Sequence, residues 1–131
     1  MVGGPGAINL LLGVADATTN SSPVMGVSAQ VGLNRIYKES YQGVDLVSMF
    51  SPVTKWADMV LTPGAVPEMV RKAFKLAQAE RPGAGYMAVP DDVEAMGMPE
   101  GLAPLNLNIP RILSAGPGSS TFQPWRHLPC P

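Results

Sequence analysis

Apolar side chains surround almost the whole of the first predicted helix. They stand at helical spacing within residues 8–17, as Ile8, Leu10, Leu11, Leu12, Val14, Ala15 and Ala17. A surface helix would leave one side polar, whereas this pattern is typical of a helix covered on nearly all sides. We therefore expect a buried helix, which ends at the polar stretch Thr18–Ser22 and Pro23.

Three short apolar runs further along the chain predict β-strands, because each has the length of a strand and is bounded by turn residues. A clear amphipathic helix from Val66 to Ala77 precedes the last run and stops before Arg81-Pro82-Gly83. The predicted strands are residues 24–29, 52–57 and 85–90, with a short helix at 44–50 and a turn or helix start at 91–93. This alternation indicates βαβ units and an α/β domain with a mostly parallel sheet.

A glycine-rich turn, Gly3-Gly4-Pro5-Gly6, opens the first helix. Pro5 suits the first helical position, where its missing N–H is not needed, and the glycines let another group approach the backbone. The free N–H groups of a helix start can also meet the polar edge of a ligand. A turn of this kind normally follows a strand, so we expect the chain to begin inside a domain.

Two segments are expected to share one binding site. In a parallel sheet, ligands bind beyond the carboxyl ends of the strands. The turn at Gly3–Asn9 and the polar segment Gln30–Gln42 would both lie at that edge. The spacing Gly4-x-Gly6-x-x-Asn9 is not a dinucleotide-binding fingerprint, because the third glycine is missing and no strand precedes it.

Composition narrows the class of protein. With 131 residues and a net charge of −1, the chain amounts to one domain without the basic face that nucleic-acid binding requires. No apolar run approaches the roughly 20 residues that cross a bilayer, and a single cysteine, Cys130, excludes an internal disulfide. The only histidine, His127, has no partner at metal-binding spacing. We therefore predict a cytoplasmic protein with no metal site, and no nucleic-acid or membrane partner.

Proline and glycine become frequent from Gly97 onward and leave little room for regular structure. We therefore divide the chain into a domain at 1–96 and a Pro/Gly-rich linker or non-native tail at 97–131.

Eight short motifs follow one another in a characteristic order. They are Gly-Pro-Gly-Ala-Ile-Asn at 4–9, Gly-Val-Ala-Asp-Ala at 13–17, Pro-Val-Met-Gly-Val-Ser-Ala-Gln-Val at 23–31, Tyr-Gln-Gly-Val-Asp at 41–45, Pro-Val-Thr-Lys-Trp at 52–56, Ala-Phe at 73–74, Arg-Pro-Gly at 81–83 and Val-Pro-Asp-Asp-Val at 89–93. This series resembles the thiamine diphosphate-dependent enzymes of the acetolactate synthase and pyruvate oxidase group. Residues 49–56 are most similar to the acetolactate synthase branch, of catabolic type, whereas the tail after Arg111 resembles no part of the group.

The resemblance implies part of the amino-terminal, pyrimidine-binding domain of such an enzyme, with an incomplete Rossmann-like, flavodoxin-like parallel sheet. It implies that Pro5, Gly6 and Asn9 lie beside the aminopyrimidine of thiamine diphosphate, and that Gln42 reaches the mouth of the active site. The glutamate that activates the cofactor in this group lies upstream of the Gly-Pro-Gly turn, and no residue here matches it. We therefore predict cofactor-binding residues but no catalytic residue in this chain.

The resemblance also implies what the rest of such an enzyme supplies. Missing domains would hold the diphosphate and Mg²⁺, with FAD use left open, and the full protein would be a homodimer or tetramer. It would convert two pyruvate molecules to 2-acetolactate and CO₂, and this chain would be an inactive fragment of it. The same domain occurs in glyoxylate carboligase, oxalyl-CoA decarboxylase and sulfoacetaldehyde acetyltransferase, so the substrate stays open. A non-catalytic binding domain is a further alternative, which requires these residues to fold stably by themselves.

Overall fold

The computed structural model describes residues 3–97, so the predicted tail at 97–131 lies almost wholly outside the described residues. In chain order the elements are α1 (Pro5–Thr19), β1 (Val24–Gln30), α2 (Leu46–Phe50), β2 (Trp56–Met59), α3 (Val66–Gln78), β3 (Ala84–Pro90) and α4 (Asp91–Ala95). Short 3₁₀ turns lie at Leu33–Arg35, Ser51–Val53 and Pro63–Ala65. The predicted α/β class is confirmed, and so is the order of its helices and strands.

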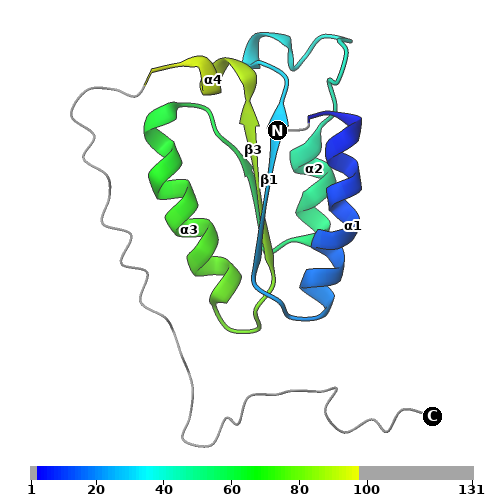
Figure 1. Ribbon diagram of the computed structural model, residues 1–131, viewed down its shortest axis with the longest axis vertical. Helices are drawn as coiled ribbons and strands as arrows, with labels where there is room; N and C mark the ends of the chain where they lie inside the picture. The colour runs from blue at the N-terminus through cyan, green and yellow to red at the C-terminus, as the bar shows by residue number, and fades with distance from the viewer. Residues whose placement is uncertain (1–2, 98–131) are drawn as a thin grey trace, which may run out of the picture.

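The sheet has three parallel strands in the order β1-β3-β2. β1 pairs with β3 from Val24 opposite Ala84 to Gln30 opposite Pro90. The central strand β3 is buried at nearly every position, as expected for a strand with neighbours on both sides. Helices α1 and α2 lie on one face of the sheet and α3 lies on the other (Figure 1). The carboxyl ends of all three strands therefore meet at one edge.

The core has one cluster on each face of the sheet, because successive residues of a strand point to opposite faces. Tyr86 of β3 packs beneath α2, where its ring stacks on Phe50 with 3.7 Å between the centroids and 4° between the planes. Neither side chain has any exposed surface. The next residue, Met87, points the other way and packs beside Val60 and Val93. The α1–α2 side is completed by Ala7, Val14, Ala17, Leu46, Ala84 and Ala88.

The Tyr86 hydroxyl is buried and shares a hydrogen bond of 2.6 Å with the Ser28 hydroxyl of β1. Burial raises the pKa of Tyr86 above its ordinary value of 10.0, and the hydrogen bond from Ser28 opposes this shift only in part. The folded protein thus holds the phenol proton more tightly than the unfolded chain does. The stability that this proton contributes is complete below about pH 10 and is lost as the pH rises through the folded-state pKa.

Tyr86→Phe is therefore expected to make the fall in stability above about pH 10 less steep, because the phenol no longer releases a proton on unfolding. Urea unfolding followed by circular dichroism between about pH 8 and about pH 11 measures the slope. Tyr37→Phe is the matched control, since the Tyr37 side chain is 97% exposed. Equal slopes for the Tyr86→Phe and Tyr37→Phe variants would contradict the expectation.

The prediction that helix α1 is buried on nearly all sides is wrong for the described residues. Only Ala7, Val14 and Ala17 are buried, whereas Leu12 is 81% exposed. The reason is that the sheet covers one side of α1 and α2 touches part of another, while the described chain places no element on the outer side.

The second strand also differs from the prediction. It runs from Trp56 to Met59 and not from 52 to 57, because Pro52 enters a 3₁₀ turn at Ser51–Val53. Proline favours the start of such a turn, since it lacks the N–H that a sheet would need. The Thr54 hydroxyl donates to the Phe50 carbonyl oxygen at 2.9 Å and keeps the chain turned until Lys55.

The amino ends of the strands are tied together by two cationic side chains. The Lys55 ammonium donates to the carbonyl oxygens of Ala79 and Arg81. The Arg81 guanidinium donates to the Ser21 hydroxyl at 2.7 Å and to the Thr19 carbonyl at 3.0 Å. The loops that lead into β1, β2 and β3 are thereby linked.

None of the helices within residues 3–97 has both the length and the apolar character needed to span a bilayer.

Candidate functional site

The glycine turn and the polar loop meet at the carboxyl edge of the sheet, as the sequence predicted. Gly3 forms a parallel bridge with Ala29, near the end of β1. Gly4 has a left-handed backbone with φ of 56°, and a Cβ placed on it would lie 2.5 Å from the Cβ of Gln42. Only glycine fits at this position, both for its φ and for the space available. The start of α1 and the loop around Gln42 are therefore in direct contact.

Gln42 itself has a left-handed backbone, with φ of 65°. This conformation is uncommon and costly for a residue with a side chain, and such residues often lie at functional sites. Gln42 is exposed and follows two exposed aromatic residues, Tyr37 at 97% and Tyr41 at 83%. The contact with Gly4 is thus made by a residue in a strained backbone conformation, at the edge where ligands bind in parallel sheets.

A polar hollow of about 550 Å³ lies where these segments meet. Gln42 and Gly3 line it together with Arg35 from the loop, and Asp91 and Glu94 from α4. Its remaining lining comes from the end of β1, at Ala29 and Gln30, and from the two residues that follow, Val31 and Gly32. One cation and two carboxylates stand around it, so its rim is mixed in charge and not a purely basic phosphate site.

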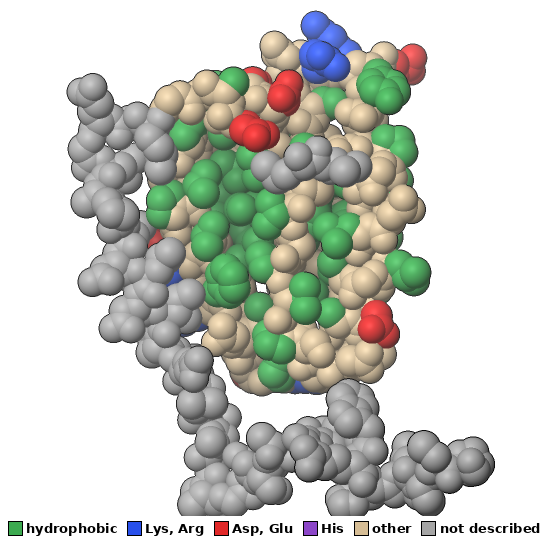
Figure 2. Space-filling model, viewed as in Figure 1, with side chains coloured by type: hydrophobic (Ala, Val, Ile, Leu, Met, Phe, Trp, Pro, Cys, Tyr) green, Lys and Arg blue, Asp and Glu red, His purple; other side chains and the backbone are tan. Residues whose placement is uncertain are grey.

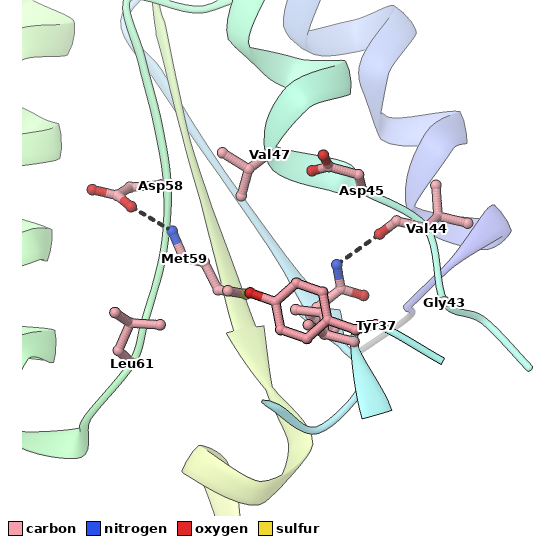
Figure 3. Close-up of a pocket in the computed structure, with 10 residues that line it drawn as sticks. Tyr37, Gly43, Val44, Asp45, Val47, Asp58, Met59 and Leu61 are labelled. Carbon is pink, nitrogen blue, oxygen red and sulfur yellow. Dashed lines mark hydrogen bonds between the residues drawn. The ribbon is translucent and has the colours of Figure 1, made fainter. Parts of the chain in front are cut away.

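An apolar hollow of about 430 Å³ adjoins the polar hollow, and Gln30 lines both. Figure 3 shows Tyr37 across its mouth, with Val47, Met59 and Leu61 on its walls. Asp45 stands at its rim as the N-cap of α2 and accepts hydrogen bonds from Ser48. The bonds from the Ser48 hydroxyl and then the Ser48 N–H hold the pKa of Asp45 below its ordinary value, so this carboxylate stays charged at neutral pH.

Gln30 is the buried polar group that shapes this edge. It is 4% exposed, and its amide nitrogen donates to the Val44 carbonyl oxygen at 2.7 Å, as the dashed line in Figure 3 shows. Its amide oxygen accepts from the Val31 N–H at 3.0 Å. A second link joins the loop to α4, where the Asp92 carboxylate accepts from the Leu33 N–H at 2.8 Å. These bonds fix the path of the chain on both sides of the polar hollow.

The four cofactor-binding residues expected from the sequence are placed unequally. Gln42 lines the polar hollow, whereas Pro5, Gly6 and Asn9 line neither hollow. All three are exposed on the first turns of α1, and Asn9 lies four residues after Pro5 on the same side of the helix. They therefore form an open helix face next to the contact between Gly4 and Gln42. Their contact with a cofactor stays a prediction.

The sequence pattern placed Gln30 at this edge as the start of the polar segment Gln30–Gln42 but did not indicate Asp91 and Glu94 as site residues. All three follow from position, because Gln30 ends β1, Asp91 comes directly after β3, and Glu94 lies in α4, which follows β3 without a break. The rule that parallel strands present their carboxyl ends to ligands could have identified them. Among residues 3–97, no group of three or more His, Cys, Asp or Glu side chains is arranged to hold a metal ion.

The fold and this edge define a class of protein, namely an α/β domain whose parallel sheet has a helix start and a polar loop at its carboxyl edge, where ligands bind in such sheets. Curated relatives make the class specific. The chain is 38% identical over 91 residues to a probable acetolactate synthase large subunit of Methanocaldococcus jannaschii. This alignment covers 70% of this chain and 15% of the relative. It is 39% identical over 90 residues to the catabolic acetolactate synthase of Raoultella terrigena, covering 69% of this chain and 16% of that protein.

A longer match reaches the acetolactate synthase large subunit of Lactococcus lactis, at 36% identity over 107 residues, or 82% of this chain and 18% of the relative. No family model matches the chain. Over the aligned residues this chain is homologous to proteins named acetolactate synthase, as its series of motifs predicted. It spans about one sixth of the length of these relatives.

Proposed function

We propose that residues 3–97 are the pyrimidine-binding part of a thiamine diphosphate-dependent enzyme that converts two pyruvate molecules to 2-acetolactate and CO₂. The observation that carries this proposal is the contact between Gly4 and Gln42, which joins the helix start to the loop at the ligand-binding edge. The names of the relatives support the reaction, since each is an acetolactate synthase.

The residues at this edge fit a flat, mostly uncharged heterocycle. No side chain caps the start of α1, where Pro5 carries no N–H and the Ala7 N–H donates to the Gly4 carbonyl oxygen at 3.0 Å, so the Gly6 N–H is the group of this first turn that could donate to a ring nitrogen. Asn9 adds an exposed amide with both a donor and an acceptor. Gly6 is exposed and offers bare backbone against which a ring can lie closely. When bound, thiamine diphosphate supplies the carbon nucleophile for reactions of 2-oxo acids, and these residues would bind and orient its pyrimidine end.

The whole enzyme needs more than these residues. In this proposal, other domains of the enzyme hold Mg²⁺ and the diphosphate, and residues 3–97 hold neither. The whole enzyme is a homodimer or tetramer, with or without FAD. It also gives them no catalytic residue. The chain by itself is therefore expected to form no acetolactate from pyruvate, even with thiamine diphosphate and Mg²⁺ present.

A chimera tests the proposal directly. The homologous segment of the Raoultella terrigena catabolic enzyme is replaced by the aligned residues of this chain, and acetolactate formation is measured with pyruvate. We expect a folded chimera that forms acetolactate. A chimera that folds and assembles like its parent but forms none would contradict the proposal.

Within that chimera, Asn9→Ala and Gln42→Ala are each expected to weaken thiamine diphosphate binding about tenfold, which corresponds to about 1.4 kcal/mol. The measurement is the cofactor concentration that gives half-maximal activity. Asn20→Ala is the matched control, because Asn20 lies at the far end of α1 and bonds only to Asp16 and Thr18 among the described residues. If Asn9→Ala behaves like Asn20→Ala, the assignment of Asn9 is wrong.

A further inference from the structure

The chain between β1 and α2 forms a loop, Val31 to Val44, over the carboxyl edge of the sheet. Figure 2 shows charged side chains of both signs at this end of the molecule, where the loop and α4 lie, so the outside of the loop is polar. The described main-chain hydrogen bonds of the loop are local, such as the bond of 3.0 Å from the Gly43 N–H to the Ser40 carbonyl oxygen. None of these bonds joins the start of the loop to its end. Closure of the loop therefore depends on side chains.

The Gln30 side chain reaches both ends of this loop. Its amide oxygen accepts from the Val31 N–H at 3.0 Å, and its amide nitrogen donates to the Val44 carbonyl oxygen at 2.7 Å. Gln30 and Val44 are 14 positions apart in the chain. Because Gln30 is only 4% exposed, water has little access to replace either bond. A single amide group thus closes the loop from beneath.

The chemistry of the two ends requires an amide. Val31 presents a donor and Val44 an acceptor, so the bridging group needs one acceptor and one donor. A carboxylate has no proton to donate, and an apolar side chain of the same length makes neither bond. Both changes leave a buried main-chain group without its partner, which is costly.

Gln42 lies two residues before the bond at Val44. Its left-handed backbone, with φ of 65°, is a conformation that persists only where the surrounding structure holds it. Gln42 is also packed against Gly4, where an added Cβ would lie 2.5 Å from the Gln42 Cβ. Since Gln30 fixes the chain just after Gln42, it sets how closely Gln42 approaches the start of α1.

The other side chain that holds the loop acts at its start. The Asp92 carboxylate of α4 accepts from the Leu33 N–H at 2.8 Å. This bond fixes the entry of the loop and leaves its exit, next to Gln42, to Gln30.

We infer that Gln30 is a positioning residue, which closes the loop between β1 and α2 and thereby places Gln42 against the start of α1. The placement of Gln42 does not depend on the proposed function. Its consequence for thiamine diphosphate binding does rest on that function.

Gln30→Met tests the placement in the full chain, because it removes both hydrogen bonds with little change in side-chain size. Gln78→Met makes the same chemical change on α3, on the opposite face of the sheet (Figure 1). The NMR cross-relaxation peak between the Gly4 Hα and the Gln42 side chain reports the contact. We expect this peak to be lost in the Gln30→Met chain and kept in the Gln78→Met chain. Peaks between the rings of Phe50 and Tyr86 show that the core is intact.

Gln30→Glu makes the closure depend on pH. A protonated carboxyl group can donate to Val44 and accept from Val31, whereas the carboxylate cannot donate. Because burial raises the pKa of the introduced carboxyl group, the peak between Gly4 and Gln42 should be present at about pH 4 and lost by about pH 8.

The unmodified chain, measured at the same two pH values, is the control for this variant. It contains the other titratable or charged groups that line the hollows beside Gln30, namely Arg35, Tyr37, Asp45, Asp58, Asp91 and Glu94. Its peak between Gly4 and Gln42 should be present at both pH values.

A peak of full strength in the Gln30→Met chain, with the core intact, would overturn the inference. A peak of equal strength at both pH values in the Gln30→Glu chain would do the same, and it decides alone if Gln30→Met does not fold. In the chimera, Gln30→Met should raise the cofactor concentration for half-maximal activity about tenfold and change kcat little. A folded chimera without acetolactate formation would contradict the proposed function, while the NMR result would still decide the role of Gln30.

Discussion

Gly4→Val is expected to lower the free energy of unfolding by roughly 2–5 kcal/mol. Gly4 has a φ of 56°, which a β-branched side chain adopts only at a cost, and the new Cβ would lie within 3 Å of three atoms of Gln42. Two of those three atoms belong to the backbone, so the overlap cannot be relieved by rotating a side chain. Urea unfolding followed by circular dichroism measures the change.

Gly13→Ala in the same helix is the matched control for Gly4→Val. A Cβ at Gly13 meets no atom within 4 Å, and the residue is exposed in the middle of α1. Alanine should therefore stabilise the helix by about 0.5–1 kcal/mol. If the Gly4 variant is as stable as the unmodified protein, the contact between the turn and Gln42 does not hold the fold together.

Phe50→Ala is expected to cost about 3–5 kcal/mol, because a fully buried aromatic ring is removed and the space cannot close completely. The ring of Phe50 stacks on Tyr86, which would lose its neighbour on that side. The free energy of unfolding of small domains is about 5–15 kcal/mol, so this loss is a large part of the total stability. Chemical unfolding gives the difference, and a melt without cooperativity would also meet the expectation.

Phe74→Ala provides the same chemical change on the opposite face of the sheet. Phe74 lies on α3 and is 40% exposed, so its removal should cost clearly less than removal of Phe50. Equal losses for the two variants would show that α2 does not anchor the core as the structure indicates.

The elements with strong periodicity could be predicted from the sequence. Helix α3 and strands β1 and β3 agree with their predicted ranges within one residue, because a long amphipathic pattern or an unbroken apolar run has few alternatives. The second strand was shifted, since Val53 and Thr54 favour strands locally while Pro52 starts a 3₁₀ turn. Local preference alone could not decide between a strand and a turn at these residues, because the turn is held by the hydrogen bond from Thr54 to the Phe50 carbonyl oxygen.

The site was predictable in outline and not in detail. The strand-end rule placed the glycine turn beside the polar loop, and the contact between Gly4 and Gln42 agrees with it. The exposed side of α1 was not predicted. The spacing of apolar residues indicates which side chains of a helix can be buried, but it does not indicate how many of them the other described elements cover. Gln30 was expected at this edge, but its hydrogen bond to Val44 was not predicted, because Val44 lies in a loop without periodicity.

The hydrogen bonds of Lys55 and Arg81 at the amino ends of the strands affect anion binding at this end of the domain. Lys55 and Arg81 look like an attractive pair of positive charges, but both already donate to main-chain oxygens. Two of the three N–H groups of the Lys55 ammonium and two of the five of the Arg81 guanidinium are used in this way. A phosphate that displaced them would leave carbonyl oxygens without a partner, which is costly. The amino-terminal end of the sheet therefore offers a phosphorylated molecule fewer hydrogen-bond donors than its two positive charges suggest.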